Sequence, residues 1–465
     1  MTFADLWAVM PHLILMVGAL VVLILGAAVP GRHGTAVGLV ALAAAAAWPL
    51  MTPPAAFAPS LGVTCTPFAR FFTVLFTLTA AASLLLSHDY NRRQDIQGEE
   101  YPATVLFAAF GMVTLSTAAN LLILFLGLEA LTFAFYILVA IDRNSLASAE
   151  AGLKYLLFGA VAAAFIAFGI ALIYTGVGTL GIETAMRLAL GGGASQLAIA
   201  GWGLLLLGIA FKVSLVPAHL WTPDVYEGAP APVVAFLSTG SKGAAFAALL
   251  LLLMGQEMTY LREPLWVMTL LSMVVGNLAA LLQTNLKRML AYSSIAQMGY
   301  VALALLTGTA AGNEAVVFYL VAYSAMNMAA FGAIATLGGD GKLEDYRGVG
   351  YLKPFTGGVL ALAMLALAGI PPTAGFIGKF FIFAAALRGG ETGLAVAGIL
   401  TAAVSAFYYL RVVVNLYMRP LQPGTSAGAP HPAEMIALGG SAAVILFLGI
   451  YPAPLLKIIS AFIFR

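Results

Sequence analysis

The sequence contains few charged residues, because Asp, Glu, Lys and Arg make up only 9% of its 465 residues. A soluble domain has about 25% charged residues. In this chain 62% of the residues are hydrophobic, and the mean hydropathy is +1.01. A globular core this apolar would leave too little polar surface to face water. The composition therefore predicts a membrane protein that crosses the bilayer many times.

Several kinds of site are also missing from the sequence. The single Cys65 allows neither a disulfide within the chain nor a cysteine-ligated metal cluster. No GxGxxG motif lies between a strand and a helix, and no phosphate-binding P-loop is present. The chain therefore cannot oxidise a nicotinamide, and in a redox machine the redox groups would lie on other chains. The small net charge of +2 argues against a nucleic-acid partner.

Long apolar runs fill almost the whole chain. About fourteen of them are near 20 residues long, the length that an α-helix needs to cross the hydrocarbon core of a bilayer. We therefore predict an all-α polytopic membrane protein with about 14 transmembrane helices. The expected spans are 6–29, 35–51, 66–87, 102–118, 120–141, 151–175, 196–227, 230–254, 264–283, 288–307, 313–337, 354–388, 393–418 and 432–452.

The basic residues between the spans predict the orientation of the chain. Fourteen spans place both termini on the same side of the membrane. If the N-terminus is outside, the inner loops and adjoining helix ends hold eleven Lys and Arg residues, Arg32 among them, and the outer ones hold six, Arg465 among them. Inner loops of membrane proteins carry an excess of positive charge. We therefore expect both termini outside. The N-terminus lacks a basic segment and a small-residue cleavage site, so the first apolar run is expected to be retained as a helix.

The seventh run is interrupted by proline and contains a lysine. Lys212 lies within its apolar part, Pro217 must break the helix nearby, and the next apolar run carries Lys242. A lysine at the centre of a spanning helix costs roughly 2.5–3.5 kcal/mol. A broken helix at membrane depth is tolerated only where it is buried in protein or lines a wet cavity. These features predict an ion path, although a lysine near a helix end can also extend to the membrane surface.

The same combination of a proline break and a lysine occurs a second time. In the segment AGIPPTAGFIGKFFIF, Pro371 and Pro372 form the break and Lys379 follows it, 167 residues after Lys212 (379 minus 212). Inverted repeats that contain discontinuous helices are a recurrent architecture of transporters. The spacing therefore suggests two repeated units, each containing one broken helix.

Glu129 is an isolated carboxylate in the apolar run LLILFLGLEALTFAFYIL. Such a carboxylate is expected to be neutralised or paired. A buried lysine binds its proton less tightly than an exposed one, and a nearby carboxylate strengthens that binding. A pair such as Glu129 and Lys212 can therefore load and release a proton when its partner moves or when water enters.

Two further residues have a functional and a simpler interpretation. Lys154 opens the sixth run in GLKYLLFGA, where it is either part of the ion path or an end residue that extends to the membrane surface. His219 follows the first break, and an imidazole, which titrates near about pH 6.5, suits a proton relay. The simpler interpretation of His219 is a hydrogen-bonded loop histidine.

Three segments of the sequence resemble a known family. They are KVSLVPAHLWTPDVYEGAP, NLKRMLAYSSIAQMGY and GIPPTAGFIGKF, and they are similar to segments of the antiporter-like membrane subunits of respiratory complex I, which in turn resemble subunits of the multi-subunit sodium/proton antiporters. The resemblance covers nearly the whole chain. It is strongest to the N-type subunits of the bacterial NADH–quinone oxidoreductase (NDH-1). An M-type subunit carries a glutamate where Lys379 stands, and an L-type subunit is longer.

The resemblance implies an organisation for the chain and a role for its buried charges. The expected parts are an N-terminal three-helix segment (1–101), two inverted five-helix repeats (102–254 and 264–418), and a C-terminal helix and tail (419–465). Glu129 and Lys212 match the ion pair of the family, and Lys154, Lys242 and Lys379 match its further lysines. With Lys242 between Lys212 and Lys379 near the middle of the bilayer, we expect gaps of several ångströms that water bridges.

The resemblance also implies partners, cofactors and a location. No cofactor is expected in this chain, whereas FMN, iron–sulfur clusters and quinone are expected on partner subunits, some of them antiporter-like themselves. The expected location is the bacterial cell (inner) membrane. We therefore predict a proton-translocating subunit of an NADH–quinone oxidoreductase. The alternatives are a subunit of a sodium/proton antiporter and a membrane scaffold that has lost transport, although a scaffold would not need to bear the cost of buried lysines.

Overall fold

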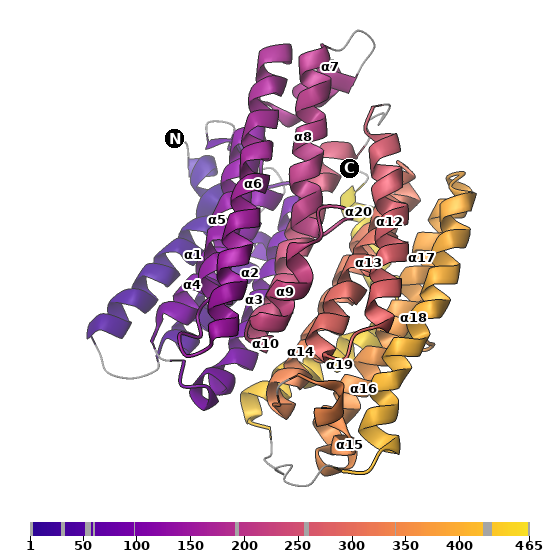
Figure 1. The fold of residues 1–465 in the computed structure, drawn as a ribbon. Coiled ribbons are helices and arrows are strands. Elements are labelled where there is room, and N and C mark those ends of the chain that lie inside the picture. Colours follow the sequence, from indigo (N-terminus) through magenta and orange to yellow (C-terminus); the bar gives the residue numbers. More distant parts are fainter. Residues whose placement is uncertain are drawn as a thin grey trace.

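The chain folds into a long bundle of helices that run roughly side by side (Figure 1). The computed structural model describes residues 3–28, 33–51, 57–58, 61–96, 98–190, 195–254, 260–339, 341–421 and 430–463. Within these ranges, twelve helices are long and apolar enough to cross a membrane. The predicted all-α membrane fold is confirmed.

The exact number of spans stays a prediction. Two of the fourteen expected spans are not among the twelve: α4 (Glu100–Ser116) has 17 residues, and the twelfth expected span is divided into the 15-residue helices α16 (Pro354–Ala368) and α17 (Ala374–Arg388). The orientation in the membrane also stays a prediction, and Arg32 and Arg465 lie outside the described residues. Figure 1 places the start of α1 and the C-terminal helix α20 in the upper half of the view.

Three long helices form the N-terminal part. Thr66 caps the third of them, because its side chain accepts a hydrogen bond from the backbone N–H of Ala69. A short antiparallel hairpin precedes this helix. The elements are α1 (Phe3–Ala28), α2 (Gly34–Met51), β1 (Phe57–Ala58), β2 (Val63–Thr64) and α3 (Pro67–Arg93).

The first half of the remaining bundle contains the first broken helix. The long apolar run that begins near residue 103 is divided at residues 117–120, where the Asn120 side chain caps the next helix by accepting from the N–H of Ile123 at 2.9 Å. The short helix α7 was not expected from the sequence. The elements after α4 are α5 (Leu121–Val139), α6 (Leu146–Val177), α7 (Ile182–Leu190), α8 (Gln196–Val213), α9 (Trp221–Gly228), α10 (Ala231–Phe236), the π-helix η2 (Leu237–Ser241) and α11 (Lys242–Leu253).

The second half contains the second broken helix. Its break begins at Gly369, whose φ of +87° ends α16. A Cβ at Gly375 would lie only 1.8 Å from the carbonyl oxygen of Ala366, so α17 can approach α16 closely only with glycine there. The elements are α12 (Arg262–Leu281), α13 (Leu286–Leu306), α14 (Ala310–Leu337), the 3₁₀ helix η3 (Leu343–Tyr346), α15 (Val349–Leu352), α16, α17 and α18 (Thr392–Met418).

The C-terminal part consists of α19 (Pro432–Ile450) and α20 (Ala453–Ile463). The sequence predicts only an apolar tail after residue 452, whereas the structure forms a helix there. At the centre of the bundle, the segment from α10 to α11 and the helices α13 and α14 are buried along almost their whole length. Polar side chains on these central segments therefore lie inside protein, and this position defines the site.

Candidate functional site

Lys212 lies in the last turn of α8, directly before the first break. The helix ends because Ser214 takes a left-handed conformation with φ of +66°, and the N–H of Leu215 returns to the carbonyl of Ala210. The hydroxyl of Thr222 on α9 donates to Ser214 Oγ at 2.6 Å, which ties the two parts of the broken helix together. The Lys212 side chain is 1% exposed, so the break holds a lysine inside protein.

The structure brings Glu129 and Lys212 together, as the sequence predicts. Lys212 Nζ lies 3.9 Å from Glu129 Oε1 and donates to Thr132 Oγ1 at 2.6 Å. Both partners project from α5 and are three residues apart, which places them on one face of the helix. The carboxylate is therefore the longer contact and the threonine the shorter one. Thr132 was missed in the sequence, although its spacing from Glu129 is a signal that could have identified it.

Lys242 occupies the start of α11, immediately after the π-helical segment η2. Short π segments within helices frequently mark functional sites. Its side chain is fully buried, and Nζ donates to Ser294 Oγ on α13 at 2.6 Å. The ammonium also lies 5.3 Å from the ring centre of Tyr226, within the range of a cation–π contact. Lys242 is thus held by neutral groups.

Lys379 lies on α17, after the second break, and is also buried. Its Nζ donates to the carbonyl oxygens of Leu367 and Ala368 at 2.7 and 3.2 Å, so the lysine caps the C-terminus of α16. The ammonium lies 5.4 Å from the ring centre of Tyr300. Among the described residues, neither Lys379 nor Lys242 has a carboxylate within ion-pair distance.

Gln297 is part of the surroundings of Lys379. Its amide nitrogen donates to the carbonyl of Leu367 at 3.1 Å, the same oxygen that accepts from Lys379, and to the hydroxyl of Tyr409 at 3.0 Å. Its amide oxygen accepts from the hydroxyl of Tyr319 at 2.5 Å. Gln297 follows Ser294 by three residues on α13, so one helix face carries the hydroxyl that accepts from Lys242 and an amide that shares the Leu367 acceptor with Lys379.

Further hydroxyls complete this polar region. Tyr323 donates to Ser294 Oγ at 2.8 Å, and Tyr409 also contacts Ser293. The gap that water bridges between Lys242 and Lys379 stays a prediction, and hydroxyl and amide side chains lie around both lysines. The side chains were missed individually, although Ser293, Ser294 and Gln297 lie in the segment NLKRMLAYSSIAQMGY that resembles the family.

The region around Lys212 contains several buried polar atoms that form no hydrogen bond with any described residue. Native proteins seldom leave such atoms unpartnered, and ordered water often supplies the partner. The Tyr226 hydroxyl lies near Ser294 and the Tyr155 hydroxyl near Ser241, but neither pair meets the geometry of a hydrogen bond. The unpartnered atoms are Glu129 Oε1, Tyr136 OH, Tyr155 OH, His219 Nδ1 and Tyr226 OH.

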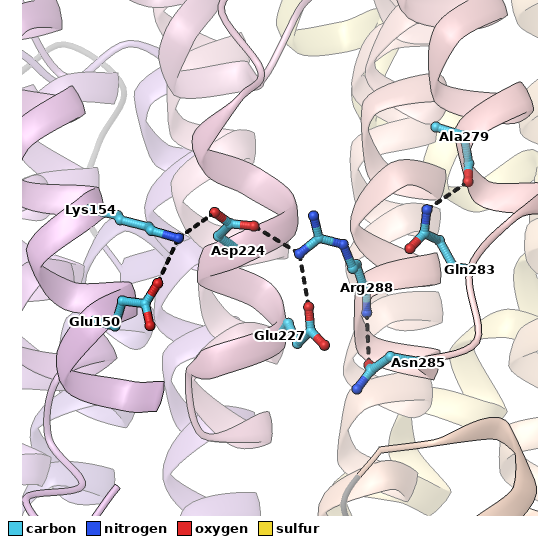
Figure 2. A network of polar contacts seen from close by, with 8 residues as sticks. All are labelled: Glu150, Lys154, Asp224, Glu227, Ala279, Gln283, Asn285 and Arg288. Atoms are coloured by element: carbon cyan, nitrogen blue, oxygen red, sulfur yellow. Dashed lines mark hydrogen bonds and ion pairs between the residues drawn. The ribbon is translucent and has the colours of Figure 1, made fainter. Parts of the chain in front are cut away.

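Lys154 lies away from this buried region, in a partly exposed group of charges shown in Figure 2. Its Nζ contacts Glu150 Oε1 at 2.8 Å and Asp224 Oδ2 at 2.7 Å, and its side chain is 38% exposed. Arg288 on α13 contacts Asp224 and Glu227, each at 2.8 Å. A cavity of about 240 Å³ borders this group. The structure therefore does not bring Lys154 to the other three lysines.

His219 lies within the break between α8 and α9 and is half-buried. It forms neither of the contacts that hold Lys212 and Lys242. Within the described ranges, no group of three or more His, Cys, Asp or Glu residues is arranged to hold a metal ion. The polar groups described around the buried lysines are thus a carboxylate, hydroxyls, amides and backbone carbonyls.

Comparison with known proteins identifies the family of the chain. A family model described as "NADH:quinone oxidoreductase/Mrp antiporter, TM" matches residues 118–405. The chain is 67% identical over 466 residues to the NADH-quinone oxidoreductase subunit N of Geotalea uraniireducens (strain Rf4), with 99% of each chain covered. It is 62% identical over 467 residues to the subunit of the same name from Geobacter metallireducens (strain ATCC 53774 / DSM 7210 / GS-15), again with 99% of each chain covered.

A solved structure has the same fold. A chain in the structure of respiratory complex I from Thermus thermophilus with bound aureothin superposes with a TM-score of 0.81 at 37% identity, covering 96% of this chain and 98% of that chain. The resemblance found in the sequence is confirmed. The chain belongs to the NADH:quinone oxidoreductase/Mrp antiporter membrane family and, within it, to the subunit N proteins of NADH-quinone oxidoreductases.

Proposed function

We propose that this chain conducts protons across the membrane while other chains of an NADH-quinone oxidoreductase transfer electrons from NADH to quinone. In this proposal FMN, the iron–sulfur clusters and quinone belong to the partner chains, some of which are antiporter-like membrane subunits. The location is the bacterial cell membrane, with both termini outside. A sodium/proton antiporter subunit is not favoured, because the relatives at 67% and 62% identity carry the oxidoreductase name.

The observation that carries the proposal is the burial of Lys212, Lys242 and Lys379 at the centre of a membrane bundle. Charged side chains inside a membrane are costly, and they usually mark a path for ions or protons. Each ammonium has a hydrogen-bond partner at 2.6 or 2.7 Å, so each can be held in its charged form. Three such residues in one chain support conduction better than a purely structural role.

In the proposed path, Glu129 and Lys212 form the element that loads and releases a proton. The long contact of 3.9 Å between them leaves room for the carboxylate to approach or withdraw. The unpartnered hydroxyls of Tyr136, Tyr155 and Tyr226 offer positions where water can join Lys212 to Lys242. His219, at the first break, is the proposed relay toward the inner side.

From Lys242 the proposed path continues through Ser294 and Gln297 to Lys379. An amide does not carry a proton under ordinary conditions, so a step past Gln297 requires the hydroxyls of Tyr319 or Tyr409, or water, to take part. Lys379 would then deliver the proton outward. In this scheme the segments 102–254 and 264–418 are two inverted repeats, each supplying one broken helix.

The test is the Lys212→Ala variant in the assembled complex. Inverted membrane vesicles report protons taken up per NADH oxidised. We expect this ratio to fall, because the variant lacks the buried ammonium that the proposed path requires. Lys457→Ala is the control, because Lys457 is exposed on α20. A normal ratio in a fully assembled Lys212→Ala complex would remove Lys212 from the path.

A further inference from the structure

The short helix α9 has two faces with different contacts. On one face, Thr222 donates to Ser214 beside Lys212, and the ring of Tyr226 lies beneath the Lys242 ammonium. Thr222 and Tyr226 are four residues apart and therefore share this inner face. At the start of the helix, the Trp221 indole N–H donates to the carbonyl of Phe211 at 2.9 Å. Any shift of α9 would therefore change the surroundings of both buried lysines.

The other face of α9 carries Asp224 and Glu227, which are three residues apart, and charges from two neighbouring helices hold it (Figure 2). Lys154 on α6 donates to Asp224 Oδ2 at 2.7 Å. Arg288 on α13 donates to Asp224 Oδ1 and Glu227 Oε2, each at 2.8 Å. Asp224 therefore lies between a cation from the first half of the bundle and a cation from the second.

A neighbouring hydrogen bond holds the end of the same helix. Lys287, adjacent to Arg288 on α13, donates to the carbonyl of Ala229 at 3.0 Å, directly after the last residue of α9. Two consecutive residues of α13 thus hold one helix of the first half. The same helix α13 also presents Ser294 to Lys242, so the position of α9 is fixed relative to the helix that carries the next part of the path.

Lys154 has no hydrogen bond to Glu129, Lys212 or Lys242, and its partners are Glu150 of its own helix and Asp224. Loss of its proton would leave a neutral amine between two carboxylates, which would forfeit both ion pairs. Its side chain is 38% exposed beside an open cavity of about 240 Å³, whereas Lys212 is 1% exposed. The surroundings of Lys154 therefore suit a permanent cation that holds a helix.

We propose that Lys154, Asp224 and Arg288 form a clasp that sets the position of α9 between α6 and α13, so that Lys154 acts on proton transfer through α9 and carries no proton itself. Lys154 and Arg288 are positioning residues in this scheme. The inference rests on the proposed function, because α9 matters to the extent that Lys212 and Lys242 conduct. By this inference, Lys154 has a different role from the three buried lysines, although all four residues are lysines.

The test compares Lys154→Arg with Lys154→Gln in the assembled complex, with protons taken up per NADH as the readout. Arginine keeps the positive charge and its ion pairs but does not release its proton. We expect Lys154→Gln to lower the ratio roughly threefold, as coupling mutations remote from a site do, and Lys154→Arg to retain most of it. Lys242→Arg is the matched control, and it should lose pumping because a proton must leave residue 242.

A second comparison tests whether Lys154 acts through Asp224. Asp224→Asn should lower the ratio at least as much as Lys154→Gln does, because it also weakens the contact with Arg288. The double variant should pump no fewer protons per NADH than the more damaged single variant, because both substitutions remove the contact between residues 154 and 224. An additive loss in the double variant would show that Lys154 acts through another group.

The outcomes separate this inference from the proposed function. If Lys154→Arg is as damaged as Lys154→Gln while Lys242→Arg also fails, Lys154 carries protons and the clasp is wrong. If Lys154→Gln pumps normally, the clasp does not control α9 and is equally wrong. If Lys242→Arg and Lys212→Ala both pump normally, the proposed function itself fails. NADH oxidation with an artificial electron acceptor measures the amount of assembled complex in each case.

Discussion

Lys212 and Lys379 both lie beside a broken helix, but their positive charges are held in different ways. Lys212 has a carboxylate at 3.9 Å and a hydroxyl at 2.6 Å, both on α5. Lys379 has two backbone carbonyls at the C-terminus of α16, an end of a helix that carries a partial negative charge. A side-chain carboxylate can move or be neutralised, whereas the end of a helix is fixed. In the proposed function, the contact that holds Lys212 is therefore the more adjustable of the two.

The two lysines also differ in how completely the polar groups around them are hydrogen-bonded. Around Lys212, hydroxyls such as those of Tyr136 and Tyr155 form no hydrogen bond with the described residues. Around Lys379, Gln297 joins two tyrosines and the Leu367 carbonyl in a region where each of these groups has a partner. Satisfied buried networks are rigid. The comparison teaches that two similar helix breaks can hold a buried lysine in surroundings whose polar groups are satisfied to different extents.

The largest effect is expected from Glu129→Gln, which tests the difference between the surroundings of Lys212 and Lys379. Removing one partner of a buried ion pair costs about 3–5 kcal/mol, because it leaves the other charge without compensation. We expect Lys212 to lose its proton more readily, and the number of protons pumped per NADH to fall. Glu129→Asp should retain part of the function.

Glu391→Gln provides the matched control for this prediction. Glu391 is a buried carboxylate of the second half that pairs with Arg262, away from the lysines. Its removal should alter stability without a comparable loss of protons pumped per NADH. If Glu129→Gln and Glu129→Asp both pump like the unmodified complex, the Glu129–Lys212 pair has no role in conduction and the contrast between the halves disappears.

A smaller effect is expected from Gln297→Leu, which tests whether the second half is rigid. Leucine removes the acceptor of Tyr319 and one partner each of Tyr409 and Leu367. An unsatisfied buried polar group costs about 1–3 kcal/mol. We expect the stability of the complex to fall by about that amount, which would appear as faster thermal inactivation. We also expect fewer protons to be pumped per NADH.

Gln283→Leu is the control for Gln297, because Gln283 is only half-buried and its amide donates to the Ala279 carbonyl alone. It should change the rate of thermal inactivation little. Equal rates in the two variants would mean that the network around Gln297 adds nothing to the stability of the second half.

The sequence predicted the parts of the site that are chemically unusual within their own segment. Lys212, Lys242 and Lys379 stand out because charges are rare in apolar runs, and Pro217 and Pro371 mark the breaks because proline cannot continue a helix. These signals are local, so they can be recognised in the sequence without knowing which helices pack together.

The missing parts depend on packing between distant segments. Thr132 and Ser294 are ordinary residues in a helix until the fold places them 80 and 52 positions away from their lysines in sequence but within hydrogen-bond distance. The separation of Lys154 from the other lysines depends on Asp224, 70 positions later. The carbonyl of Leu367 carries no sequence signal at all, because every residue has one.

The smallest expected effect concerns the backbone of the two breaks, which begin at Ser214 and Gly369 with φ of +66° and +87°. A left-handed conformation costs about 1–2 kcal/mol for a residue other than glycine. Ser214→Gly removes that cost but also removes the oxygen that accepts from Thr222, a hydrogen bond worth about 0.5–1.5 kcal/mol. The two terms nearly cancel, so we expect a thermal inactivation rate close to that of the unmodified complex. Gly369→Ala should be destabilised by about 1–2 kcal/mol, and its Cβ would lie 3.1 Å from Lys379 Cδ. A marked loss of stability in Ser214→Gly would show that the serine hydroxyl, rather than the helix break itself, holds α8 and α9 together.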